Sequence, residues 1–168
     1  LMHDLSRGPW LDATLDSMLR SNGLARDAMA PLAPNACTDI TGFGLLGHLL
    51  ELCEQSNLDA RLDLDGLSLL PGTEELVARG VVSTLKPAND QVLTRCEHRD
   101  IADDDPRLAA ATDPQTSGGL LFSVDPGLRD AALAALTQAG VKAAVIGDMS
   151  VKDHKALTCI ILNRNAPC

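Results

Sequence analysis

Two short loops of the sequence combine a carboxylate with glycines and small hydroxyl side chains, a combination that can bind both anions and cations. One loop, residues 38–44, reads TDITGFG, and the other, residues 113–119, reads DPQTSGG. Glycine has no Cβ, so the main chain can approach a ligand closely, and successive backbone N–H groups can hold a phosphate. The two loops therefore suggest a phosphate and metal subsite.

Asp39 is the candidate metal ligand. It precedes an expected helix at residues 42–56, and the positive end of the helix dipole favours an ionised carboxylate. Mg²⁺ in proteins typically takes one or two carboxylates together with substrate phosphates. The sequence leaves a second interpretation open, in which Asp39 only complements the dipole and satisfies local amides.

The glycines of the first loop have two interpretations. Gly42 and Gly44 are expected in the first turn of the helix 42–56, with Thr41 as its N-cap. A phosphate at the helix N-terminus would explain two glycines there. Tight packing of the helix against a sheet would explain them equally well.

The second loop is equally open. Asp113 can be a ligand or can form an Asx turn, and Gly118 and Gly119 have the same two interpretations as the first pair. Gln115, Thr116 and Ser117 can hydrogen-bond a phosphate or a ribose, or can close the loop on itself.

No residue is predicted to be catalytic. The sequence contains no Walker A, G-x-S-x-G or H-E-x-x-H motif. Cys37 is expected to be a poor nucleophile, because the charge of Asp39 raises the pKa of a nearby thiol. His48 is expected to be a partly exposed helix residue.

The composition predicts an acidic protein with an aliphatic core. Of its 168 residues 45% are hydrophobic but only 2% are aromatic, so Leu, Ala, Val and Ile must fill the core. The net charge of −9 repels nucleic-acid phosphates and anionic membranes, and no basic run compensates for it. We therefore expect neither a nucleic acid nor a membrane as partner, and a nucleotide must be bound through cations.

The cysteines indicate a cytoplasmic protein. Their number, five, is odd and no two form a C-x-x-C pair, which favours reduced thiols over disulfides or a zinc site. The sequence shows no signal-peptide pattern and no apolar run long enough to span a membrane. Because it opens at Leu1 without a methionine, we expect a fragment of a longer protein.

Hydrophobic periodicity predicts helices at residues 9–22, 24–32, 42–56, 73–78 and 126–139. It predicts strands at 36–40, 60–64, 119–124, 142–146 and 157–162, a polar turn at 148–155, and an irregular segment at 86–107 with a short helix at 90–96. Leu11, Leu15, Met18 and Leu19 share one stripe of the first helix, and Arg61 and Asp63 are expected on the outer face of their strand. The pattern predicts a single α+β domain over residues 1–168, with a mixed or antiparallel sheet covered by helices.

The two loops lie within longer motifs that resemble one enzyme family. Residues 37–48, CTDITGFGLLGH, resemble the TDVTGFGLLGH block of selenophosphate synthetase, also called selenide, water dikinase. Residues 113–121, DPQTSGGLL, resemble the second signature of that family, and residues 70–72 and 146–148 also match it. The resemblance covers most of the chain from about Ala28 onward.

The resemblance implies an activity and a fold. The family converts ATP, selenide and water into selenophosphate, AMP and orthophosphate, and its members resemble aminoimidazole ribonucleotide synthetase in fold. They have an N-terminal ATP-binding half that dimerises and a C-terminal α+β half, and this chain resembles the C-terminal half only. The implied partners are ATP, selenide, the protein's own N-terminal domain and a second copy of the full-length protein, with Mg²⁺ as the cofactor.

The same resemblance implies roles for individual residues. Asp39 would complete the Mg²⁺ site from across the domain cleft. The residues implied to line that cleft are Thr41, Gly42, Gly44, Asp113, Gln115, Thr116, Ser117, Gly118 and Gly119. The family's catalytic cysteine or selenocysteine, its lysine and its other metal-binding aspartates have no counterpart, and Cys37 and Lys86 do not replace them. We therefore expect the isolated chain to turn over no ATP.

Two other functions stay open. One is a related ATP-dependent enzyme of the same superfamily, such as a hydrogenase-maturation dehydratase or a thiamine-phosphate kinase, although these resemble the DPQTSGG signature only loosely. The other is a stand-alone binding module without a catalytic half.

Overall fold

The structure is a computed structural model and describes residues 5, 7–99, 101–152 and 159–162 of the chain. Its α-helices are α1 (Gly8–Leu19), α2 (Gly23–Met29), α3 (Gly44–Ser56), α4 (Thr73–Ala78), α5 (Lys86–Asn89), α6 (Pro106–Thr112) and α7 (Arg129–Gln138). Its strands are β1 (Ala36–Asp39), β2 (Leu58–Asp63), β3 (Cys96–Arg99), β4 (Leu120–Ser123), β5 (Gly147–Val151) and β6 (Cys159–Leu162). The 3₁₀ turns are η1 (Ala30–Leu32), η2 (Leu64–Gly66), η3 (Asp90–Arg95) and η4 (Pro126–Leu128). This confirms the predicted α+β class.

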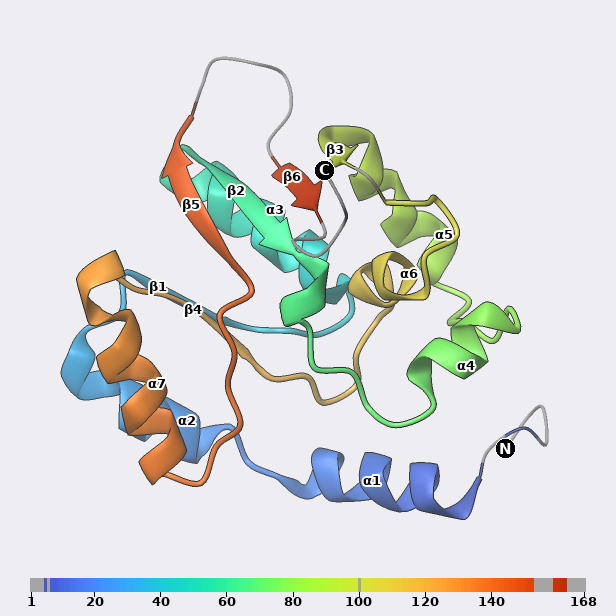
Figure 1. The fold of residues 1–168 in the computed structure, drawn as a ribbon, viewed down its shortest axis with the longest axis horizontal. Helices are drawn as coiled ribbons and strands as arrows, with labels where there is room; N and C mark the ends of the chain where they lie inside the picture. The colour runs from blue at the N-terminus through green and yellow to red at the C-terminus, as the bar shows by residue number, and fades with distance from the viewer. Residues whose placement is uncertain (1–4, 6, 100, 153–158, 163–168) are drawn as a thin grey trace.

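The strands form two sheets (Figure 1). β1 and β4 make a two-stranded antiparallel ribbon, and the other sheet is mixed, with the strand order β3-β6-β2-β5. In the mixed sheet β6 runs parallel to β2 and β3, whereas β5 runs antiparallel to β2. β5 begins at Gly147. A residue with a Cβ would not fit there, because that Cβ would collide with the carbonyl oxygen of Arg61 in β2. The predicted mixed or antiparallel sheet is therefore confirmed, but it is divided in two.

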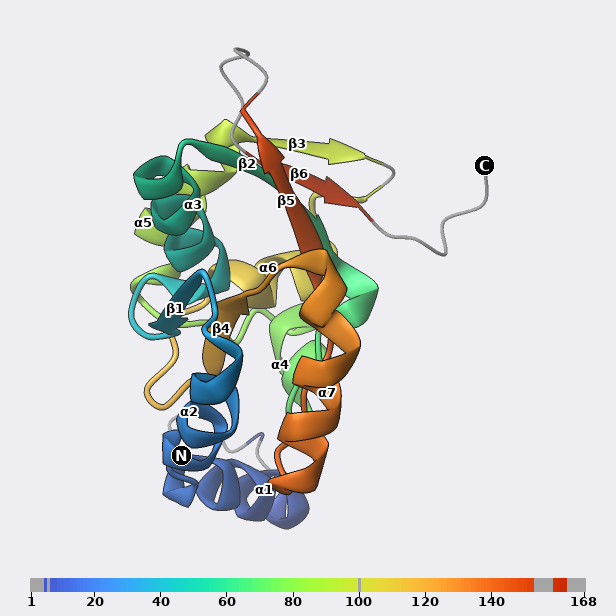
Figure 2. The same ribbon diagram turned by 90° about the vertical axis from the view of Figure 1, so that its left-hand side faces the viewer.

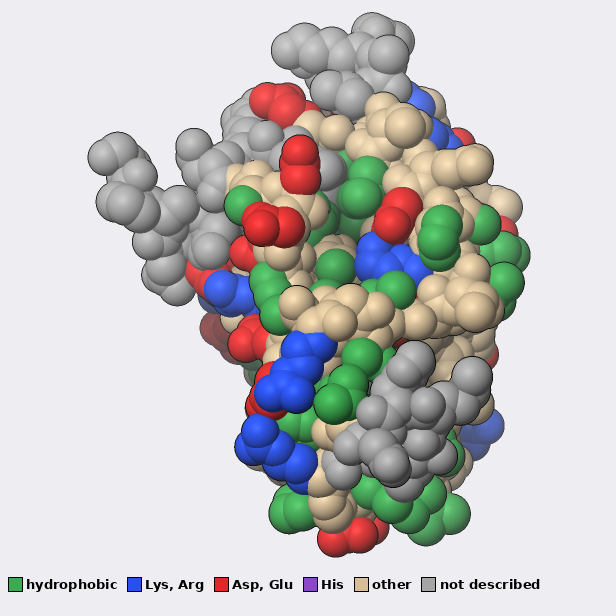
Figure 3. Space-filling view, turned by 90° about the vertical axis from the view of Figure 1, so that its right-hand side faces the viewer, with side chains coloured by type: hydrophobic (Ala, Val, Ile, Leu, Met, Phe, Trp, Pro, Cys, Tyr) green, Lys and Arg blue, Asp and Glu red, His purple; other side chains and the backbone are tan. Residues whose placement is uncertain are grey.

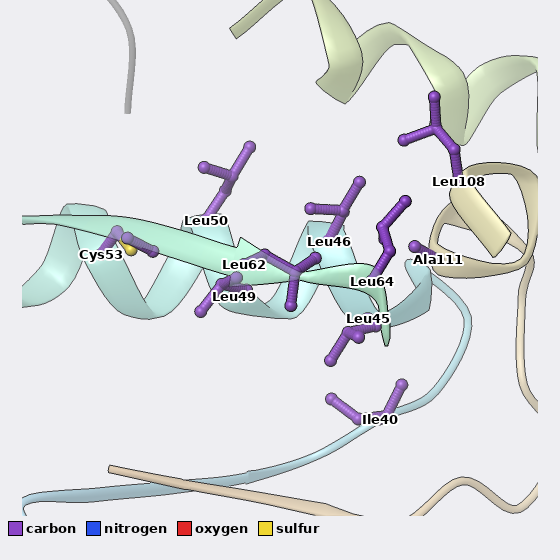
Figure 4. Packing of buried hydrophobic residues seen from close by; sticks show 11 residues of the cluster. Ile40, Leu45, Leu46, Leu49, Leu50, Cys53, Leu62, Leu64, Leu108 and Ala111 are labelled. Carbon is purple, nitrogen blue, oxygen red and sulfur yellow. The ribbon is translucent and has the colours of Figure 1, made fainter. Parts of the chain in front are cut away.

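The main core lies around α3. Figure 4 shows side chains of α3 directed towards those of β2, while Leu108 and Ala111 approach from α6 and Ile40 from beyond β1. These residues are almost completely buried, and each buried leucine contributes about 1.5–3 kcal/mol of hydrophobic stabilisation. The sequence places Leu45, Leu46, Leu49, Leu50 and Cys53 at helical spacing on one face of the expected helix 42–56, and all five are buried.

A second, smaller core lies between α2 and α7, which lie side by side in Figures 1 and 2. Met29 and Leu136 are buried there. The ribbon separates the two cores, because Leu121 packs against the main core whereas Leu120 and Phe122 pack against the second. Both faces of the ribbon are thus held in place, which fixes the loops at its ends.

Helix α1 lies at the end of the molecule farthest from the mixed sheet (Figures 1 and 2). The Trp10 ring packs over Gly72, and the Arg7 guanidinium stacks 4.6 Å from the centroid of that ring. The predicted apolar stripe exists, but the described residues do not bury it, since Leu15 and Met18 remain 44% exposed. Sequence periodicity identified the helix, and tertiary packing left its apolar side uncovered.

Several predicted boundaries are wrong. The strand expected at 142–146 is absent, and β5 occupies residues 147–151, where a polar turn was expected. The strand expected at 157–162 begins at Cys159 in β6, and residues 157–158 lie outside the described residues. The segment 86–107 contains α5, η3, β3 and the start of α6. Asp63 is buried, because β2 passes into η2 and its carboxylate accepts the Asp65 N–H.

The surface and the helix lengths give two further facts. On the face shown in Figure 3, acidic and basic side chains are interspersed with hydrophobic and uncharged ones. In the part of the chain that the structure describes, every helix is too short or too polar to cross a membrane.

Candidate functional site

The ribbon brings the two glycine-containing loops together. Its antiparallel register places the end of β1 beside the start of β4. Beyond that pair, the Ile40 N–H donates to the Gly119 carbonyl oxygen over 3.0 Å, and the Gln115 N–H donates to the Thr41 carbonyl oxygen over 3.0 Å. Two loops that are far apart in the sequence are therefore joined directly through their main chains.

Asp39 is exposed at the end of β1. Within the described residues its carboxylate has no hydrogen bond and no ion pair. Cys37 precedes it by two positions and is exposed on the same face of the strand. Partial burial raises the pKa of Cys37, and the negative charge of Asp39 raises it further, which confirms the expected effect on this thiol. Asp39 is thus accessible to an ion, and its charge affects the pKa of Cys37.

The first loop ends in a turn instead of the first turn of a helix. The Gly44 N–H donates to the Thr41 carbonyl oxygen over 3.1 Å, and Phe43 has a φ of −90° and a ψ of 0°, as in the third position of a type I turn. Helix α3 begins at Gly44, so the N-cap role predicted for Thr41 is wrong: its hydroxyl lies 3.1 Å from His48 Nε2. The helix dipole consequently begins two residues farther from Asp39 than expected.

Each glycine pair divides into one glycine required for packing and one with open space beside it. Gly44 has a φ of 68°, and a Cβ there would lie 2.8 Å from the carbonyl group of the last residue of α6. A Cβ on Gly118 would collide with the carbonyl oxygen of Ile40. Gly42 and Gly119 are exposed, and no atom lies within 4 Å of a Cβ built on either. Of the four, Gly42 and Gly119 leave room for a ligand at the main chain.

The polar residues of the second loop also divide by role. One carboxylate oxygen of Asp113 accepts the Ser83 N–H over 3.2 Å, which ties the loop to the segment between α4 and α5. Gln115 is half-buried and bonds the first loop through its N–H. Thr116 and Ser117 are exposed, and their hydroxyls have no hydrogen-bond partner among the residues described. Asp113 therefore has a structural bond, whereas the two hydroxyls face solvent.

Two residues that sequence reasoning missed hold the first loop. His48 is buried, not partly exposed as predicted, and its Nε2 accepts the Thr41 N–H over 3.1 Å. The Asn89 side-chain amide donates to the carbonyl oxygens of Gly42, over 2.9 Å, and Thr112, over 3.0 Å. A single histidine on a helix face of leucines was a signal for the first of these roles. Nothing in the local sequence marked Asn89.

Lys86 is also buried, and its charge is paired. Its Nζ lies 2.6 Å from a carboxylate oxygen of Asp90 and donates to the Thr112 hydroxyl over 3.1 Å. The Thr112 hydroxyl in turn donates to the same Asp90 oxygen over 2.5 Å. This lysine therefore fastens α5 and η3 to α6 and does not face the two loops as a free cation.

The described residues offer few metal ligands. Among them, no three His, Cys, Asp or Glu side chains are placed to hold a metal ion together. A free carboxylate suits a hard cation such as Mg²⁺, but that ion gives up its water reluctantly and one carboxylate holds it weakly. Asp39 fits the role of one ligand in a site completed by other groups.

A comparison with protein families agrees with this arrangement. The family described as "AIR synthase related protein, C-terminal domain" matches residues 25–160. The chain belongs to the AIR synthase related family. The match begins in α2 and ends in β6, so this C-terminal domain contains the ribbon and both loops, whereas α1 lies outside it.

Individual relatives narrow the similarity to one kind of enzyme. The selenide, water dikinase of Trichlorobacter lovleyi is 40% identical over 130 residues, which are 76% of this chain and 37% of that protein. The proteins of the same name from Photobacterium profundum and Pseudomonas straminea are 41% and 42% identical, over 62% and 68% of this chain and 32% of each relative. The chain therefore spans about a third of the length of these curated relatives. The resemblance to selenophosphate synthetase is confirmed.

Proposed function

We propose that this chain is the C-terminal part of an ATP-dependent selenophosphate synthetase, which makes selenophosphate, AMP and orthophosphate from ATP, selenide and water. The relatives named selenide, water dikinase support this activity over the hydrogenase-maturation and thiamine-phosphate kinase alternatives. The observation that carries the proposal is the accessible carboxylate of Asp39 next to the open main chain of Gly42 and Gly119.

In the proposed site, Asp39 gives one oxygen ligand to the Mg²⁺ that accompanies ATP. Bound Mg²⁺ supplies the positive charge that neutralises phosphoryl oxygens during transfer. The N–H groups of Gly42 and Phe43 have no acceptor within the described residues, so both can donate to phosphate oxygens. The exposed hydroxyls of Thr116 and Ser117 are further donors. The chain thus lines one side of a nucleotide cleft.

The rest of the cleft is proposed to belong to the N-terminal domain of a longer protein, which is a cytoplasmic homodimer. Phosphoryl transfer requires several cations and aligned oxygens, and the described residues supply one suitable carboxylate. We therefore expect no turnover by this chain alone. Chromatographic measurement of AMP after incubation with ATP, selenide and Mg²⁺ tests this, and selenide-dependent AMP above a protein-free blank would contradict it.

Cation binding at Asp39 can be measured through the neighbouring thiol. Burial and then the Asp39 charge raise the pKa of Cys37, so a cation on Asp39 lowers that pKa and increases the thiolate fraction. We therefore expect Mg²⁺ to accelerate Cys37 alkylation, because the thiolate is the reactive form. The assay is iodoacetamide labelling at constant pH, with Cys37 modification read by peptide mass spectrometry.

Two controls make the result specific. KCl at matched ionic strength corrects for general screening of the Asp39 charge. The variant Asp39→Asn should label faster than the parent without Mg²⁺ and should show no further response to it. A parent that labels equally fast in Mg²⁺ and in matched KCl, or an Asp39→Asn variant that still responds, would refute Asp39 as a cation ligand.

A further inference from the structure

His48 is the polar exception on the buried face of α3. It is 8% exposed, and the residues that share this face with it are Gly44, Leu45, Leu46, Leu49, Leu50 and Cys53. Burying an imidazole ring is unfavourable unless its nitrogens are hydrogen-bonded. A leucine would fill such a position without that requirement, so the hydrogen bonds of His48 explain why a histidine stands there.

The hydrogen bonds define the state of the ring. A backbone N–H can only donate, so His48 Nε2, 3.1 Å from the Thr41 nitrogen, is the acceptor. The neutral ring then carries its proton on Nδ1, which lies 4.0 Å from a carboxylate oxygen of Glu51. The Phe43 ring stands 5.7 Å from the imidazole, centroid to centroid. His48 therefore contacts the first and third residues of the turn that follows Asp39.

The turn has engaged and unengaged main-chain groups. The Thr41 N–H is taken by His48, the Thr41 carbonyl accepts from Gln115 and Gly44, and the Gly42 carbonyl accepts from Asn89. In contrast, the N–H groups of Gly42 and Phe43 have no acceptor among the described residues. Rotation of the turn would exchange these roles. The bonds from Gln115 and Asn89 hold its carbonyl groups, and His48 is the group that accepts its inward N–H.

We propose that His48 is a positioning residue for the nucleotide side of the domain: its Nε2 acceptor draws the Thr41 N–H inward and thereby holds the Gly42 and Phe43 amides outward beside Asp39. That these amides serve to bind a nucleotide rests on the proposed function. The orientation of the Thr41 N–H itself requires the acceptor at position 48, and it predicts that hydrogen-bonding capacity at this position matters more than side-chain volume.

Two variants of the 168-residue chain separate these properties. Gln at position 48 keeps an oxygen acceptor at about the reach of Nε2, whereas Leu fills the space without one. With ¹⁵N-labelled protein, we expect the Thr41 amide to exchange about fivefold faster in His48→Leu, as the loss of one net hydrogen bond implies, and to stay within about twofold of the parent in His48→Gln. The Leu136 amide in the second core is the internal control and should not change in either variant.

Paramagnetic Mn²⁺ in the same spectra reports the site itself. It should broaden the Asp39 and Gly42 signals of the parent and His48→Gln at lower concentrations than those of His48→Leu. Unchanged Thr41 exchange in His48→Leu, or faster exchange in both variants, would overturn the proposal. If Mn²⁺ broadens neither signal of the parent, Asp39 binds no cation in this chain, and Thr41 exchange alone decides the role of His48. Should His48→Leu not fold, His48→Asn, whose side chain is too short to reach Thr41, must show the faster exchange that His48→Gln lacks.

Discussion

Replacing Gly44 with alanine is the sharpest test of how the first loop is built. Gly44 has a φ of 68°, in the left-handed region that glycine occupies without strain. An alanine Cβ would lie 2.8 Å from the carbonyl carbon and oxygen of Thr112 and 3.0 Å from the carbonyl oxygen of Ala111. These are main-chain atoms at the end of α6, and they cannot move aside as a flexible side chain can. The substitution must therefore shift α3 against α6.

The expected loss combines three effects. The left-handed conformation costs a residue with a Cβ roughly 1–2 kcal/mol, and an extra methyl group in a packed interior costs about 1–3 kcal/mol. Alanine also lowers the entropy of the unfolded chain, which offsets about 0.4–1 kcal/mol. We expect the free energy of unfolding to fall by about 2–4 kcal/mol.

Urea denaturation followed by circular dichroism measures this loss, and Gly42→Ala is the matched control. With a urea slope of about 2 kcal/mol/M, the midpoint of Gly44→Ala should fall by about 1–2 M. Gly42 lies outside the left-handed region, and no atom lies within 4 Å of the position that an alanine methyl group would take there. Its variant should therefore stay within about 0.5 kcal/mol of the parent. Equal midpoints for the two variants would refute the assignment of Gly44 to packing and Gly42 to open space.

The second loop and the main core give two further predictions. Gly118→Ala should destabilise the chain by about 2 kcal/mol or more in the same assay, because its Cβ would collide with the Ile40 carbonyl oxygen. Gly119→Ala, the control, should be nearly neutral, since no atom lies within 4 Å of its Cβ. A neutral Gly118→Ala would contradict the contact between the two loops. Burial and then the charge of Asp59 raise the pKa of Cys53 from 9.0 to about 11, so its contribution to stability is full below pH 9 and is lost as the pH rises towards 11. Between those pH values the parent should therefore lose about 2–3 kcal/mol more stability than Cys53→Ala, and parallel pH profiles would show that the thiol does not titrate as described.

The sequence predicted elements best where the local pattern and the tertiary core agree. The leucine face of α3 recurs at helical spacing, and the same residues fill the core against β2. The predicted helix through Ala78 ends where α4 ends, with Gly80 in the left-handed conformation just beyond it, although its N-cap is Gly72 and not Thr73 as predicted. Strands β1 and β4 were found within one or two residues. In α3 and β4 the apolar residues that set the local pattern are also the residues that pack against another element.

The missed elements depend on partners that the local sequence does not reveal. Residues 142–145 are apolar enough for a strand but are exposed, while β5 follows at Gly147–Val151 because β2 pairs with it there. α6 was missed although its Asp105-Pro106 pair resembles Asp125-Pro126, where a helix start was correctly expected for η4, while α7 itself begins only at Arg129. In α6 the Asp105 carboxylate does accept the Arg107 N–H, whereas Asp125 makes no capping bond to its helix.

The candidate site shows the same division. Residue types alone singled out both loops, and the ribbon register places them together. They could not say which glycine of each pair is needed for packing, because the main-chain groups that crowd Gly44 and Gly118 belong to α6 and to the other loop. They also missed His48 and Asn89, which hydrogen-bond main-chain groups of the first loop and belong to no recognisable motif.

The free groups at the end of β1 restrict what can bind there. Asp39 attracts a cation and repels an anion. The unengaged N–H groups of Gly42 and Phe43 attract an anion and cannot coordinate a cation. Inorganic phosphate alone would meet the carboxylate charge, and a metal ion alone would leave the amides unused. A phosphate that carries its own divalent cation satisfies both kinds of group at once. The strongly acidic chain adds to this preference, since a net charge of −9 disfavours every polyanion whose charge is not compensated.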